Sequence, residues 1–136
     1  MIRSTTLLSL IAVALAVPAL RAELPESTKI GEFHAGSQAY TFRLFTVQEA
    51  LEKIAAAGGK TVELFPGQKF SKEGDAKFDH NSTPEQRQIV KDKAKSLGLT
   101  LVGYGVVKLS NNEAEQRQIF GFAKDMGISV VVSEPA

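Results

Sequence analysis

The residues of this sequence that could do chemistry lie at or just beyond the ends of short β-rich runs. Six of them carry polar groups suited to binding or proton transfer: Gln38, Tyr40, Glu63, His80, Tyr104 and Glu134. The two carboxylates can accept a proton or ligate a cation, and the amide, imidazole and phenol groups can hydrogen-bond a polar ligand. Because the chain has no cysteine, any metal must be held by oxygen and imidazole ligands.

Each candidate also has an ordinary structural explanation. Tyr40 has the alternating position at which a strand aromatic is often part of the core, and His80 lies in a loop where a histidine is usually exposed. Glu63 stands between two apolar strand residues, where a carboxylate is costly unless it faces a wet, polar opening. Glu134 fits either a ligand position or a solvated strand end.

The elements that must position these residues follow a repeated order of strand and helix. Strands are predicted over 37–42, 61–65, 100–107 and 128–133, and a capping residue followed three positions later by Glu or Gln predicts each helix start. The pairs are Thr46 with Glu49, Thr83 with Gln86 and Asn112 with Glu115, and glycines end the helices. The predicted buried faces are Val47, Ala50, Leu51, Ile54 and Ala55; Ile89, Val90, Ala94 and Leu97; and Ile119, Phe120, Ala123 and Met126.

This order of elements predicts an α/β fold with a parallel sheet. Strands separated by helices run parallel through right-handed crossovers, which leaves a barrel or an open doubly wound sheet. In both, ligands gather at the carboxyl ends of the strands. The five residues 85–89 recur as 115–119, either as a structural repeat or as chance convergence of two amphipathic helices. We expect 23–36 to be an extended lead-in without elements and 66–82 to be a long loop.

The first 22 residues are typical of a signal peptide. A positive start precedes an 11-residue apolar run over 7–17, which is shorter than the roughly 20 residues that a membrane span needs, and small residues follow. A membrane anchor is the alternative interpretation. We therefore expect a periplasmic or secreted protein with no membrane association after signal removal. The 16 basic and 15 acidic residues include no basic run, so no nucleic-acid partner is expected.

Four segments at the strand ends resemble the xylose isomerase-like TIM barrel family of sugar phosphate isomerases and epimerases. They are Gly36 to Arg43, Val62 to Gly67, Val102 to Val106 and Val132 to Pro135. The resemblance covers about 36–136 and implies the first half of a TIM barrel, with four strands and three helices of the eight of each in a complete barrel. A divalent metal (Mn, Mg, Co or Zn) and a small-molecule sugar are implied as cofactor and substrate.

The family isomerises or epimerises sugars by moving a proton between neighbouring carbons. The resemblance implies that Glu134 is a metal ligand and an acid/base residue, and that Gln38, Tyr40, Glu63, His80 and Tyr104 shape the sugar pocket. Strands five to eight, which carry most metal ligands in the family, are absent, so we expect a truncated isomerase or epimerase that needs its missing carboxyl-terminal half. The alternatives are a non-catalytic half-barrel that forms a homodimer and binds carbohydrate, and an open four-stranded sheet of the receiver or flavodoxin type.

Overall fold

The computed structural model describes residues 24 and 26–134, and its main body is one parallel sheet with three α-helices. The sheet strands are β3 (Ser37–Gln38), β4 (Thr61–Leu64), β7 (Thr100–Lys108) and β8 (Val130–Glu134), in the order β3-β4-β7-β8. The helices are α1 (Val47–Ala56), α2 (Pro84–Ser96) and α3 (Glu113–Asp125). The predicted α/β class, with four parallel strands and three helices, is confirmed. The predicted signal peptide lies outside the described residues.

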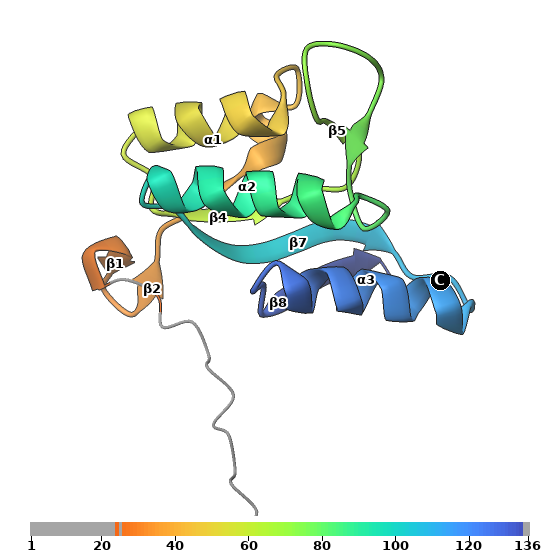
Figure 1. Ribbon diagram of the computed structural model, residues 1–136. Helices are drawn as coiled ribbons and strands as arrows, with labels where there is room; N and C mark the ends of the chain where they lie inside the picture. Colours follow the sequence, from red (N-terminus) through yellow and green to blue (C-terminus); the bar gives the residue numbers. More distant parts are fainter. Residues whose placement is uncertain (1–23, 25, 135–136) are drawn as a thin grey trace, which may run out of the picture.

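All three helices cover one face of the sheet (Figure 1). The strands follow one another in chain order and every neighbouring pair is parallel, so right-handed crossovers place successive helices on the same side. An open doubly wound sheet reverses its order and carries helices on both faces. Neither feature occurs among the described residues, and the other face of the sheet is left free of helices.

The helix starts form where the capping residues predicted them. Thr46 and Thr83 each accept a hydrogen bond from the backbone N–H three residues on, and the side-chain oxygens of Glu49 and Gln86 accept one from the capping residue's own N–H. Asn112 caps α3 by accepting from the N–H groups of residues 114 and 115. None of the described helices has the length and apolar character needed to cross a membrane.

The core between helices and sheet differs from prediction at two helix positions. Ile89 and Phe120, both predicted to be buried, are 46% and 51% exposed, whereas Phe122 is fully buried. Phe122 packs its ring against Phe78 and Tyr104, with centroids 5.7 and 4.7 Å apart. The five-residue repeat therefore occupies different environments in the two helices, because Ile119 is buried while Ile89 is not.

The predicted first strand over 37–42 is wrong after its second residue. The chain leaves the sheet after Gln38, the residue paired with Glu63, and forms a 3-10 helix, η2 (Ala39–Phe42), whose first residue is fully buried. The buried side-chain amide of Gln68 donates to the carbonyl oxygens of Phe42 and Phe45, each at 3.3 Å, which holds the turn that follows. Tyr40 thus lies on η2 and not on a strand.

Two segments predicted to lack elements contain small hairpins. The lead-in forms η1 (Glu26–Thr28) and an antiparallel pair, β1 (Lys29–Ile30) with β2 (Phe33–His34). The long loop contains a second antiparallel pair, β5 (Gln68–Lys69) with β6 (Lys77–Phe78). The last strand also begins two residues later than predicted and extends to Glu134. Two-residue strands carry too few alternating side chains to produce a recognisable period.

Candidate functional site

Gln38 and Glu63 meet on neighbouring strands at the helix-free face. They are direct register partners in β3 and β4, and the Gln38 side-chain amide donates to Glu63 Oε1 at 2.7 Å. The same amide nitrogen donates to the carbonyl oxygen of Gly105 in β7 at 3.3 Å. Val62 and Leu64 are buried against the helices, so alternation along β4 turns Glu63 to the other face. The Glu63 carboxylate thus has a fixed position beside space that helices do not fill.

Two glycines of β7 make room for this arrangement. A Cβ atom at Gly103 would lie 2.9 Å from Glu63 Cγ, and one at Gly105 would lie 2.4 Å from the carbonyl oxygen of Val132 in β8. Both distances are shorter than real Cβ contacts allow. The backbone of β7 therefore approaches its neighbours closely on this face, which is the role that glycine plays inside a strand.

A pocket of about 360 Å³, here called the carboxyl-end pocket, opens beside these polar groups. Tyr40 and Phe65 form an aromatic wall in edge-to-face contact, with centroids 5.1 Å apart and planes at 80°. The exposed Arg43 guanidinium lies over the Tyr40 ring, 4.9 Å from its centroid. The pocket is lined by Gln38, Tyr40, Phe65, Pro66, Gly105 and Val106.

A larger pocket of about 540 Å³ lies at the opposite end of the sheet. It is bounded by the amino-terminal hairpin, by the residues that lead into β3 and β4, and by the end of α1. In parallel α/β folds, ligands bind at the carboxyl ends of the strands. The smaller carboxyl-end pocket is therefore the better candidate.

His80 and Tyr104 form a separate pair outside the carboxyl-end pocket. Tyr104 is completely buried on the helix-covered face against Phe122, and its hydroxyl oxygen accepts from the His80 N–H at 3.2 Å. His80 Nδ1 lies 3.1 Å from the same oxygen, so the hydroxyl proton can be donated to it. Burial raises the pKa of Tyr104 well above its usual value, which keeps the phenol protonated. The predicted pocket roles of these two residues find no support in this arrangement.

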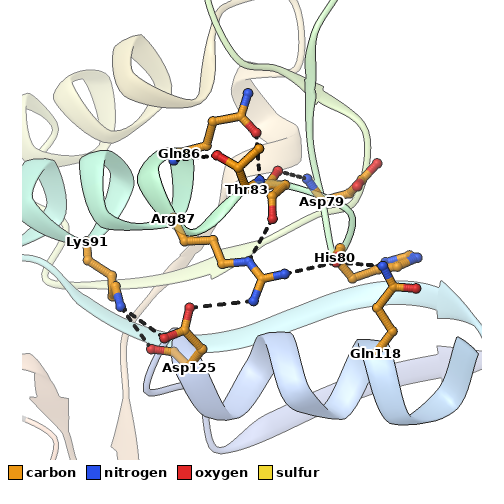
Figure 2. A network of polar contacts seen from close by, with 9 residues as sticks. Asp79, His80, Thr83, Gln86, Arg87, Lys91, Gln118 and Asp125 are labelled. Atoms are coloured by element: carbon orange, nitrogen blue, oxygen red, sulfur yellow. Dashed lines mark hydrogen bonds and ion pairs between the residues drawn. The ribbon is translucent and has the colours of Figure 1, made fainter. Parts of the chain in front are cut away.

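Arg87 of α2 holds the loop that carries His80 (Figure 2). Its guanidinium donates to the carbonyl oxygens of Ser82 at 2.9 Å and His80 at 3.2 Å, and it lies 3.6 Å from the carboxylate of Asp125. Gln118 of α3 donates to the same His80 carbonyl at 3.3 Å. The network joins α2, α3 and the loop before α2, so it orders this loop at the carboxyl end of the sheet.

Glu134 does not gather metal ligands among the described residues. It is exposed at the carboxyl end of β8, and its register partner across the strand pair is the cation Lys108. No group of three or more His, Asp or Glu side chains is arranged to hold a metal ion in the described part of the chain. The described residues therefore do not fit the metal that the resemblance implies.

Pairing in the sheet identifies pocket residues that local sequence patterns do not single out. Val106 lines the pocket, and the Gly105 carbonyl binds Gln38, although 67 residues separate these two partners. The only sequence signal for this contact is the alternation of Gly103, Tyr104 and Gly105. Arg87 has no local signal, because its role depends on joining the loop that carries His80 and Ser82 to Asp125 of α3.

Comparisons with known proteins give the fold and no function. No protein-family model matches the chain, and no curated protein matches it. An uncharacterized protein from Parabacteroides distasonis ATCC 8503 has a similar crystal structure, with a TM-score of 0.68 and 23% sequence identity. The match covers 74% of this chain and 42% of that one, so this chain spans less than half the length of its structural relative. At this identity the likeness supports the fold alone.

Proposed function

We propose that the protein binds a sugar in the carboxyl-end pocket, as the first half of a sugar isomerase- or epimerase-like barrel. One observation carries the proposal: Gln38, which donates a hydrogen bond to Glu63, lines the same pocket as the Tyr40–Phe65 wall, at the carboxyl ends of parallel strands. A sugar presents hydroxyl groups at its rim and C–H groups on its faces. The carboxylate and the Gly105 carbonyl can accept from hydroxyl groups, while the aromatic wall can cover an apolar face.

The Gln38–Glu63 bond gives the pocket a fixed acceptor. Gln38 uses one amide nitrogen for Glu63 and Gly105, so the carboxylate is oriented before a ligand arrives. A preorganised acceptor loses little conformational entropy on binding. Because a carboxylate has about four acceptor positions, Glu63 retains capacity for hydroxyl groups of a sugar.

The proposed reaction class is transfer of a proton between neighbouring sugar carbons, as the family resemblance implies. Such a reaction needs a base near the reacting carbon and a group that polarises the oxygen atoms. The Glu63 carboxylate is hydrogen-bonded to Gln38, which lines the pocket, and it is the proposed source of the base. We therefore expect the isolated chain to bind sugars without converting them, and turnover by a purified monomer would contradict this expectation.

Calorimetric titration with a panel of aldoses, ketoses and their phosphates tests the binding proposal. Glu63→Gln keeps an oxygen that can accept from Gln38 but removes the charge, so we expect about tenfold weaker binding or more, since hydrogen bonds to charged groups contribute about 1.5–3 kcal/mol. Glu113→Gln, a matched change of an exposed α3 carboxylate, is the control and should leave affinity unchanged. Absence of saturable binding by the unmodified chain, or equal affinities for Glu63→Gln and the original, would refute the proposal.

A further inference from the structure

Gln68 is a polar side chain enclosed in the core. It is 1% exposed, and its Oε1 atom accepts no hydrogen bond from any residue that the structure describes. Its amide nitrogen donates to the carbonyl oxygens of Phe42 and Phe45, each at 3.3 Å. An apolar side chain of similar size would fill this position without burying an unpaired acceptor. Packing alone therefore does not require an amide here, and the two donated bonds are what distinguishes Gln68.

These two bonds, here called the Gln68 bridge, join the segments that carry the aromatic wall of the carboxyl-end pocket. Tyr40 lies in η2, two residues before Phe42, and Phe65 follows β4, three residues before Gln68. Neither ring belongs to a strand, so strand pairing does not set the distance between them. The rings nevertheless meet edge to face, with centroids 5.1 Å apart. The bridge thus ties together the two loops on which the wall depends.

The backbone that carries Gln68 is itself anchored in the core. Gln68 is the register partner of Phe78 in the β5–β6 pair, and the Gly67 N–H donates to the Phe78 carbonyl oxygen at 3.1 Å. Phe78 is fully buried, and its ring lies 5.7 Å from that of Phe122 in α3. The amide therefore projects from a fixed point of the core and holds the more exposed η2 turn against it.

We infer that Gln68 is a positioning residue for the carboxyl-end pocket, because its bridge holds Tyr40 and Phe65 in the contact that forms the wall. A wall that is held in place before a ligand arrives loses little conformational freedom on binding. The effect of Gln68 on sugar affinity rests on the proposed function. The geometry of the ring contact does not, since it can be measured without any ligand.

Nuclear Overhauser effects between the ring protons of Tyr40 and Phe65 test the inference in the full chain. Gln68→Met keeps the length of the buried side chain and removes the amide, so we expect these effects to be lost. Sugar affinity should fall about twofold to tenfold, which corresponds to one side chain that must be ordered again on binding. Gln116→Met is the matched control, because the Gln116 amide donates to the Ser110 carbonyl at 2.7 Å outside the pocket, and it should change neither measurement. Far-UV circular dichroism checks that each variant keeps its fold.

Gln68→Glu separates the bridge from a general effect on stability. A neutral carboxylic acid can donate to a carbonyl oxygen, whereas a carboxylate can only accept, and burial raises the pKa of a carboxyl group. We expect the ring contact of Gln68→Glu to be present near about pH 5 and to be lost as the pH rises toward about pH 8. The ring contact of the original chain should not change over this range.

An unchanged ring contact in folded Gln68→Met would overturn the inference, whether or not a sugar binds. Loss of the contact with unchanged sugar affinity would support the bridge and contradict the part of the wall in binding. If the original chain binds no sugar, the proposed function fails, and the ring contact still decides the role of Gln68.

Discussion

At the scale of single residues, position on the sheet separates the groups that face the pocket from those that stabilise the core. Gln38 and Glu63 lie on the helix-free face, whereas Tyr104, only one residue from Gly105, is buried against Phe122. Successive strand residues point to opposite faces, so neighbours in sequence take different roles. A polar residue near a strand end is thus a site candidate only on the open face.

Removal of the Tyr104 hydroxyl tests this separation. Tyr104→Phe keeps the ring packing but leaves the His80 N–H and Nδ1 without their partner. We expect the free energy of unfolding to fall by about 1–2 kcal/mol, measured by urea denaturation, because partly buried polar groups lose a hydrogen bond. Sugar affinity should stay within about twofold, and a loss as large as that caused by Glu63→Gln would place Tyr104 in the binding site after all.

At the scale of elements, the helix starts were predictable, because each depends on residues that are close together in the sequence. The caps of all three helices involve residues within three positions of each other, so their spacing alone identifies them. The exposed Ile89 and the early end of the first strand were not predictable in this way. Each depends on which neighbour the element packs or pairs with, and periodicity carries no information about that.

The capping boxes of α1 and α2 differ in one ionisable group, which predicts a difference in pH dependence. The backbone N–H of Thr46, followed by Lys72, lowers the pKa of Glu49 from 4.5 to about 2. A folded-state pKa below the unfolded value contributes stability that is present above about pH 4.5 and is lost as the pH falls toward 2. The equivalent residue in α2 is the neutral Gln86.

We therefore expect Glu49→Gln to reduce stability at pH 7 and to cost progressively less as the pH falls from 4.5 toward 2. Gln86→Ala should reduce stability by an amount that does not change over this range, since an amide does not titrate. Urea denaturation of the three proteins at several pH values measures both effects. Parallel pH profiles for the original chain and Glu49→Gln would contradict the assigned cap.

At the scale of the whole molecule, the parallel sheet followed from the repeated order of strand and helix, but its single helix layer did not, because that order allows both a barrel and an open doubly wound sheet. The convergence of Gln38, Glu63 and Gly105 did not, because it joins three strands separated by 25 and 67 residues. Only the register of the sheet determines which strand residues become neighbours. Residues from three of the four segments at the predicted strand ends line the carboxyl-end pocket.

We propose that a sugar binds on the helix-free face at the carboxyl ends of the strands. Chemical-shift mapping of the isotope-labelled chain during titration with the best ligand of the panel tests this claim most directly. We expect saturable shifts at the amides of Gln38, Tyr40, Phe65 and Gly105, with the outer surfaces of α2 and α3 unaffected. Shifts confined to the helices or to the pocket at the amino ends of the strands would contradict the claim.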